Sequence, residues 1–330
     1  KINLYEFNFN FINLFEIFSI FKRVKKINPN LIQSWMYHSD FLASVLKLFY
    51  KYNCLWCVRS GTLKLSYKNI FTIILRKICS FISYKFVDNI IFCSKESMFL
   101  HEKIGYDKSK SILIPNGYDV NYYNEVLPYK YELKKKFNIP DNSFIISIIG
   151  RLHNQKNHIF FLELMKRLCK KDKNFLGAII TSSNFDSKIY KKIKNIINDN
   201  KLNQKIIFID GSSNYNKIIN IVDLNIMCSS WGEAFPNVIC ETMLTKIPNI
   251  SYNIGDVSNI MVSKDYIIDD LNEDEFVKKI NYAYNIKKNF PDQWEKLRER
   301  SREHIVLNYK LKFMITKYIH IWRKNFNEKY

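Results

Sequence analysis

Short apolar runs alternate with amphipathic helical patterns along most of this chain, and that alternation constrains its fold more than any other feature. We predict strands at residues 31–35, 54–58, 89–93, 111–114, 144–149, 176–181, 205–209, 224–227, 249–252 and 266–268. Such alternation is typical of parallel sheets covered by helices. The sequence therefore predicts the α/β class, and its 330 residues are enough for two domains.

One segment, from about residue 120 to residue 142, lacks any strand pattern. It is polar and charged, and it contains Pro128 and Pro140. Domain boundaries fall in stretches of this kind because few contacts cross them. We therefore place the domain junction there, and we predict a helical tail from Pro291 to Tyr330.

The formal net charge of +20 favours anionic partners such as phosphates, an anionic membrane surface or a nucleic acid. No nucleic-acid-binding module is visible in the sequence, so we expect no nucleic acid partner. Seven cysteines without framework spacing indicate a reducing compartment, and we find no run of about twenty apolar residues that would span a membrane. We predict a cytoplasmic protein, with an added peripheral contact on the inner face of the cell membrane.

A first candidate site follows the predicted strand 224–227. The segment from Gly232 to Glu241 holds Glu233 and Glu241, and Pro236 suits the first position of a helix. A helix start exposes free N–H groups and the positive end of a dipole, which suits a phosphate. From spacing alone, a helix with one glutamate near its cap and one solvated glutamate is an equally good interpretation.

A second candidate site follows the predicted strand 144–149. The strand ends in Gly150 and Arg151, and we expect Lys156 to open a long amphipathic helix. The two basic side chains lie five residues apart at a junction between loop and helix, so both can reach one anion. Two solvated basic residues are the plain alternative.

Two more segments complete the pattern. The strand 111–114 ends in a turn containing Asn116 and Gly117, and Gly255-Asp256 follows the strand 249–252. With the two candidate sites, and in this order, these motifs resemble the family 4 type of retaining nucleotide-sugar glycosyltransferase. The resemblance covers about residues 28 to 265.

The resemblance implies the GT-B fold, which has two Rossmann-like lobes. Residues 1–125 would form an acceptor-side lobe, residues 126–305 a nucleotide-sugar lobe, and residues 306–330 a helix that packs back on the first lobe. Related chains begin with a strand and a glycine-rich turn, and nothing similar precedes residues 27–30. We therefore expect the N-terminal lobe to be incomplete.

The resemblance also implies roles for individual residues. Arg151 and Lys156 match the diphosphate-binding pair, Glu241 the ribose-binding carboxylate, and Glu233 the carboxylate beside the donor sugar. The remaining donor-binding candidates are Ala234, Phe235, Pro236, Asn237, Asn116 and Gly117. His38, just past the strand 31–35, could meet donor sugar or acceptor, although a histidine at a helix start is often only a cap.

The function implied is transfer of a sugar from a nucleoside-diphosphate sugar to a surface polysaccharide or a lipid-linked glycan. Protein cations would neutralise the leaving group, so we expect no metal and no cofactor. Front-face attack and double displacement both stay open. The alternatives are a non-catalytic nucleotide-binding or scaffold protein, an inactive fragment of such an enzyme, and a phosphorylase or epimerase of the same fold group.

Overall fold

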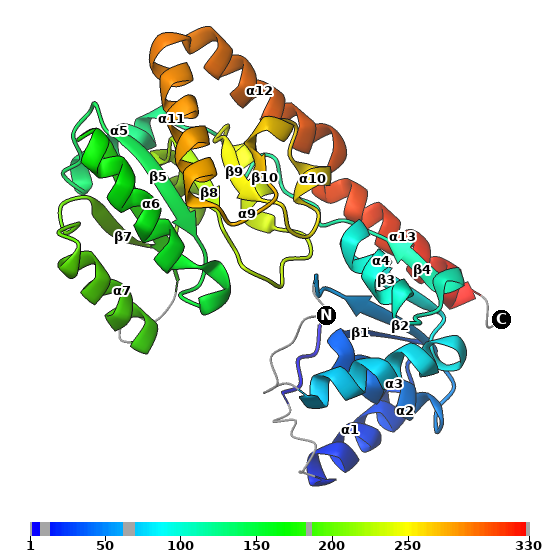
Figure 1. Ribbon diagram of the computed structural model, residues 1–330. Coiled ribbons are helices and arrows are strands. Elements are labelled where there is room, and N and C mark those ends of the chain that lie inside the picture. The colour runs from blue at the N-terminus through cyan, green and yellow to red at the C-terminus, as the bar shows by residue number, and fades with distance from the viewer. Residues whose placement is uncertain (1, 7–13, 62–69, 183–186, 328–330) are drawn as a thin grey trace.

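The computed structural model describes residues 2–6, 14–61, 70–182 and 187–327. Two separate parallel sheets organise these residues, one in each half of the chain (Figure 1). The first sheet uses residues between Leu31 and Leu113, and the second uses residues between Phe144 and Ile268. The observed class is therefore the predicted one.

The first sheet has four parallel strands in sequence order, β1 (Leu31–Trp35), β2 (Asn53–Val58), β3 (Asn89–Phe92) and β4 (Ser111–Leu113). Successive side chains of a strand point to opposite faces of its sheet. On one face the sheet packs against α2 (Met36–Lys47) and α3 (Ile70–Phe86), with α1 (Leu14–Ile27) and α4 (Lys95–Lys103) in the same layer. On the other face, Leu55, Cys57 and Ile91 contact α13 (Leu311–Asn327).

The second sheet has six parallel strands in the order β10-β9-β8-β5-β6-β7. The strand bounds are β5 (Phe144–Ile149), β6 (Phe175–Thr181), β7 (Ile206–Asp210), β8 (Leu224–Met227), β9 (Asn249–Tyr252) and β10 (Ile267–Ile268). The chain builds outward from β5 in one direction and from β8 in the other. The order therefore reverses between β5 and β8, and in open α/β sheets ligands bind at the carboxyl ends of strands at such a point.

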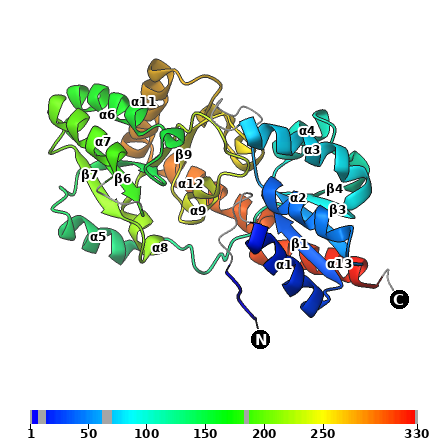
Figure 2. The same ribbon diagram turned by 90° about the horizontal axis from the view of Figure 1, so that it is seen from below.

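Helices cover both faces of the second sheet (Figure 2). Their bounds are α5 (Leu127–Lys136), α6 (His158–Lys171), α7 (Lys188–Asp199), α8 (Tyr215–Ile218), α9 (Asn237–Leu244), α10 (Val257–Ile260), α11 (Glu273–Asn289) and α12 (Pro291–Asn308).

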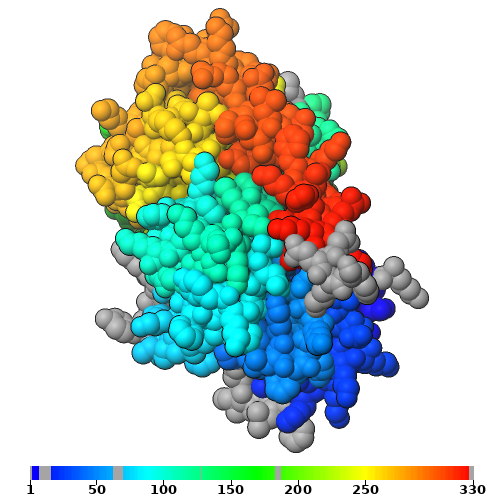
Figure 3. All heavy atoms as spheres, turned by 90° about the vertical axis from the view of Figure 1, so that its right-hand side faces the viewer, coloured from blue at the N-terminus to red at the C-terminus, as the bar shows by residue number. Residues whose placement is uncertain are grey.

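The C-terminal segment joins the two lobes. Helix α12 packs against α9 of the second lobe, and α13 continues onto the first lobe (Figure 3). The predicted helical tail is interrupted between them, because Tyr309 and Lys310 pair with the extended backbone at Tyr118. The Tyr118 N–H donates to the Tyr309 carbonyl, and the Leu311 N–H donates to the Tyr118 carbonyl, each over 2.8 Å.

All the predicted strands are present, and each end lies within one residue of its predicted place. Helix starts differ more. Lys156 was expected to open a helix, but it lies in a 3-10 turn (Asn154–Lys156), and α6 begins after Asn157, whose φ is +59°. Pro236 is the cap residue before α9, and the helix begins at Asn237.

Candidate functional site

The side chain of Lys156 crosses the end of β5 and so reaches the point between β5 and β8 where the strand order reverses. Gly150 follows that strand with φ of +150°, and a Cβ built on it would lie 3.0 Å from Cε of Lys156. A side chain at residue 150 would therefore occupy the path of the lysine. The glycine lets the ammonium group extend toward the loop after β8.

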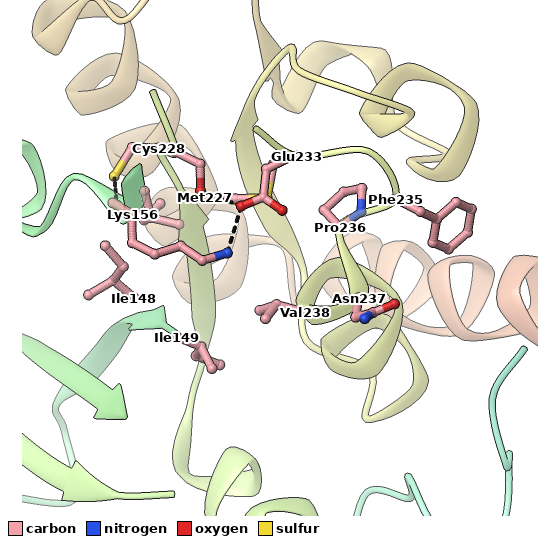
Figure 4. A pocket seen from close by; sticks show the side chains of 12 residues that line it. Ile148, Ile149, Lys156, Met227, Cys228, Glu233, Phe235, Pro236, Asn237 and Val238 are labelled. Atoms are coloured by element: carbon pink, nitrogen blue, oxygen red, sulfur yellow. Dashed lines mark hydrogen bonds and ion pairs between the residues drawn. The ribbon is translucent and has the colours of Figure 1, made fainter. Parts of the chain in front are cut away.

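In that loop, Glu233 receives two hydrogen bonds. Lys156 Nζ donates to its Oε1 over 2.6 Å, and Ser229 Oγ donates to the same oxygen over 2.8 Å. Glu233 is 9 % exposed. Figure 4 shows the two charged side chains pointing toward one another beside Pro236 and Asn237. These residues line a cavity of about 170 Å³, which we call the first cavity.

A second cavity of about 280 Å³ adjoins the first, since Ile149 and Val238 line both. Its polar lining includes Arg151, Tyr215 and Glu241. Together the two cavities form a two-part depression at the carboxyl ends of β5 and β8.

Glu241 stands on the second turn of α9, where Tyr215 donates a hydrogen bond to its Oε2 over 3.0 Å. Burial raises the pKa of Glu241 above its ordinary value, and hydrogen bonds from Tyr215 and Tyr123 oppose that rise. A buried carboxylate with hydroxyl donors around it can also accept hydrogen bonds from the hydroxyls of a ligand.

The two predicted cations lie on the same edge of the sheet as the two carboxylates, but in different cavities. Lys156 lines the first cavity, and Arg151 is exposed at the second. Among the described residues, Arg151 forms no ion pair. An anion lying across both cavities could bind both cations, as the sequence predicted for one shared anion.

Asn237 and Asn116 meet across the lobes. Asn237 Oδ1 accepts hydrogen bonds from Asn116 Nδ2 over 2.8 Å and from the Tyr118 hydroxyl over 2.6 Å. Arg59 donates to Asn116 Oδ1 over 3.0 Å. The Asn237 side chain is thus engaged in a connection between the lobes, while its position at the start of α9 keeps its backbone at the first cavity.

The side chain of Phe235 points away from Lys156 and Glu233 (Figure 4). Its ring packs edge-on against Tyr309, with centroids 5.4 Å apart. Phe235 still lines the first cavity, whereas Gly117 lines neither cavity, and a Cβ at Gly117 would be 2.8 Å from Cα of Leu311. The structure therefore places Gly117 against α13, where the chain returns to the first lobe.

Ala234 takes part through its backbone. Its carbonyl accepts a hydrogen bond from the Asp256 N–H over 2.9 Å. A Cβ on Gly61, from the first lobe, would lie 1.6 Å from the Glu233 carbonyl oxygen, and a Cβ on Gly255 would lie 2.5 Å from the same oxygen. The peptide that carries Glu233 is thus held between two glycines, one from each lobe.

His38 is placed on the first turn of α2 in the first lobe. It is half-buried and lines neither cavity, and its ring centroid is 6.2 Å from that of Phe71. The structure does not bring it into contact with Lys156 or Glu233.

Several residues that shape the site were not predicted to do so. Ser229 fixes Glu233, Tyr215 and Tyr123 bind Glu241, and the carboxylate of Asp256 accepts hydrogen bonds from the N–H groups of Lys95 and Glu96 over 2.8 and 2.9 Å. Asp256 appeared in the Gly255-Asp256 motif, and Ser229 lies two residues past the end of β8. No pattern in the sequence marks Tyr215 or Tyr123.

Among the residues that the structure describes, no cluster of three or more His, Cys, Asp or Glu side chains could hold a metal ion. None of the described helices combines the length and apolar character needed to cross a bilayer.

A model of the family described as glycosyl transferases group 1 matches residues 130–304, more than half of the chain. The chain belongs to the glycosyl transferases group 1 family. The matched residues include Arg151, Lys156, Glu233 and Glu241. Both cavities therefore lie within the part of the chain that the family model matches.

Two curated relatives are similar in sequence. An uncharacterized glycosyltransferase of Methanocaldococcus jannaschii is 25% identical over 245 residues, covering 71% of this chain and 58% of the relative. The UDP-Gal:alpha-D-GlcNAc-diphosphoundecaprenol alpha-1,3-galactosyltransferase of Escherichia coli is 27% identical over 162 residues, covering 48% of this chain and 41% of the relative. This chain spans less than two thirds of the length of either.

Solved structures share the fold. A glycosyltransferase of Rickettsia africae has a TM-score of 0.80 at 21% identity, with 98% of this chain and 85% of that chain covered. HepE of Anabaena, in complex with UDP, has a TM-score of 0.82 at 14% identity, with 94% and 82% covered. The fold is therefore GT-B, with two Rossmann-like lobes.

Proposed function

We propose that this glycosyltransferase is a retaining enzyme of the family 4 type that uses a nucleoside-diphosphate sugar as donor. The observation that carries the proposal is the pair of Lys156 and Glu233, 2.6 Å apart in a cavity at the start of α9. The adjoining cavity with Arg151 and Glu241 supplies room for the nucleoside.

The chemistry needs positive charge where the diphosphate leaves. The bond between the anomeric carbon and the diphosphate oxygen breaks, and its electron pair passes to the diphosphate. A new bond forms from the anomeric carbon to an acceptor hydroxyl, which loses its proton. Lys156, Arg151 and the N–H groups at the start of α9 stabilise the growing negative charge without a metal. The proposal commits to neither front-face attack nor double displacement.

We assign Glu241 to the ribose hydroxyls and Glu233 to the hydroxyls of the donor sugar. Uridine diphosphate is the first nucleotide to test. HepE was solved with UDP, and the E. coli relative is named for UDP-galactose. The base and the sugar are open to experiment.

The proposed division of the chain follows the sequence expectation. Residues 126–305 would hold the donor, residues 1–125 the acceptor, and residues 306–330 would brace the two. We propose a surface polysaccharide or a lipid-linked glycan as acceptor, since the E. coli relative is named for a diphosphoundecaprenol-linked one. His38 lies in the acceptor lobe, and we propose that it contacts the acceptor or the donor sugar. A peripheral contact with anionic membrane would suit such an acceptor.

Calorimetric titration with UDP, ADP and GDP tests the proposal. We expect micromolar binding of at least one nucleotide, unchanged by EDTA. Arg151→Ala and Lys156→Ala should each weaken it about tenfold or more, because each removes a charge-assisted hydrogen bond. Lys170→Ala, an exposed lysine of α6, is the matched control. Absence of binding to all three nucleotides would favour a non-catalytic scaffold.

A further inference from the structure

Helix α3 of the first lobe exposes a row of apolar side chains and buries several polar ones. Its buried residues include Arg76, Ser80 and Ser83. Its exposed side chains are mostly apolar, with Phe81 82 % exposed. The exposed apolar residues are Ile70, Phe71, Ile74, Ile78, Phe81 and Tyr84, which we call the α3 face. A helix on the surface of a globular protein normally turns its apolar stripe inward.

Hydrogen bonds to neighbouring segments fix this orientation. The Asp107 N–H donates to the Ser83 hydroxyl over 3.0 Å, and Cys79 Sγ donates to the Tyr37 carbonyl over 3.6 Å. Leu75 and Cys79 pack into the same core as the strands. Rotating α3 to hide the α3 face would break these contacts and expose Leu75 and Cys79, so the apolar side chains stay at the surface.

The charges around the α3 face indicate what covers it. Helix α3 contains no acidic residue, and Lys77 and Lys85 are exposed on it. Helices α1, α2 and α3 together hold eight basic residues and two acidic ones. One of the two acidic residues, Asp40, is fully buried, and α1 exposes Lys22, Lys25 and Lys26 in the same helical layer. The exposed surface of these three helices thus combines apolar side chains with an excess of positive charge.

We propose that the α3 face docks on an anionic lipid bilayer. The apolar side chains would enter the boundary between headgroups and acyl chains, and the lysines would contact the anionic headgroups. Helix α3 is a seventeen-residue helix and is not a candidate for crossing a bilayer, so it would lie in the membrane plane. This pairing of apolar and basic groups suits a bilayer better than it suits a second copy of this chain, because two such faces would repel.

The position of the α3 face indicates which end of the first lobe would lie near the membrane. Its N-terminal end holds Phe71, whose ring centroid lies 6.2 Å from that of His38, directly after β1. The carboxyl ends of the first-lobe strands face the second lobe, where Gly61 lies against the Glu233 carbonyl. If the proposed function holds, the α3 face would bring a lipid-linked acceptor to that end of the lobe.

Vesicle sedimentation with the full chain tests the docking. The probe is a vesicle of equal parts phosphatidylcholine and phosphatidylglycerol, with pure phosphatidylcholine for comparison. The test variant is Ile74→Ser with Phe81→Ser. The matched control is Ile315→Ser with Phe326→Ser, the same residue types exposed on α13, which covers the opposite face of the sheet.

We expect the wild type to bind the anionic vesicles, to bind less in high salt and to bind pure phosphatidylcholine weakly. The α3 variant should lose about tenfold or more of its partition coefficient, and the α13 control should keep it. Equal binding by wild type and the α3 variant would overturn the proposal. A second result would also overturn it. If the wild type dimerises, binds no vesicles and loses the dimer in the α3 variant, the α3 face is assigned to a second copy of the chain.

The same variants are titrated with UDP, which separates the two proposals. Unchanged UDP affinity in the α3 variant shows that the second lobe is intact, and an unchanged urea-unfolding transition shows the same of the first lobe, so its loss of vesicle binding supports the docking. Vesicle binding without any nucleotide binding would support the docking and contradict the proposed function.

Discussion

Glu233 holds the ammonium group that we propose for the diphosphate, so the carboxylate and the donor compete for Lys156. Glu233→Gln removes the competing charge and the hydroxyl-binding carboxylate together. We expect UDP affinity to stay equal or to rise, while transfer falls about tenfold to a hundredfold, because a hydrogen bond to a charged group is lost. Calorimetry and turnover of a labelled nucleotide sugar measure the two effects.

Glu163→Gln, at an exposed carboxylate of α6, is the matched control and should change neither quantity. A fall in UDP affinity of Glu233→Gln that matched the fall in turnover would contradict the competition.

Burial opposes the ionisation of Glu241 in this site. The pKa of Glu241 is raised in the folded state. Its favourable contribution to the free energy of unfolding is therefore complete below the unfolded pKa near 4.5, and it is lost as the pH rises through the folded pKa. Glu241→Gln should therefore be more stable than wild type at neutral pH and equal to it in mild acid. It should also bind UDP more weakly, because an amide is a poorer acceptor for ribose hydroxyls.

Urea unfolding at several pH values, with calorimetry on the same samples, checks this prediction. Tyr215→Phe should increase the pH dependence, since it removes a hydrogen bond that lowers the pKa of Glu241. A Gln variant that is less stable than wild type at neutral pH would show that burial of the charge is not the governing cost.

At the scale of elements, α4 is capped by its own Ser94 and also by a carboxylate from the other lobe. Ser94 accepts from the Ser97 N–H over 3.0 Å, and the Asp256 carboxylate accepts from the N–H groups of Lys95 and Glu96. Asp256→Ala would leave two N–H groups at a helix start without acceptors. We expect a loss of about 2 kcal/mol in the free energy of unfolding, and a smaller loss for Asp256→Asn.

The comparison is Ser187→Ala, which removes an ordinary cap from α7 and should cost about 1 kcal/mol. Chemical denaturation measures all three variants. An Asp256→Ala protein as stable as Ser187→Ala would mean that the contact between the lobes adds nothing to the cap.

At the scale of the whole molecule, the close contact between the two lobes depends on Gly61. Its missing Cβ leaves room for the Glu233 carbonyl, which would otherwise be 1.6 Å away. Gly61→Ala should hold the lobes apart and lower transfer about a hundredfold, by displacing the acceptor side from the donor. UDP affinity should change little, because both cavities belong to the second lobe.

Small-angle scattering should show a larger radius of gyration for Gly61→Ala, and calorimetry serves as its internal control. Wild-type turnover in this variant would show that the observed closure is not needed for the reaction.

Much of the architecture follows from local patterns. The runs Phe144–Ile149 and Leu224–Met227 were predictable as strands because short, uncharged and mostly apolar stretches of this length suit strands covered on both faces. Helix starts were less predictable. The left-handed backbone of Asn157 ends the turn that holds Lys156, and asparagine only weakly signals that conformation.

The candidate site divides in the same way. Arg151, Lys156, Glu233 and Glu241 were singled out because strand ends and helix starts concentrate ligand-binding groups. The hydrogen bonds that these four residues make were not predicted. Lys156 and Glu233 are 77 residues apart, and Tyr215 reaches Glu241 from a different strand end, so their partners depend on strand order in the sheet.

The sequence by itself determined the class, the alternation of strands and helices, and the set of charged groups, because each depends on a pattern within a few residues or on the order of motifs. Only the tertiary structure decided that Asn116 bonds to Asn237, that Gly61 lies on Glu233, that Gly117 supports α13, and that α3 turns its apolar side outward. These contacts depend on which faces of separate elements meet, and no single segment encodes that choice.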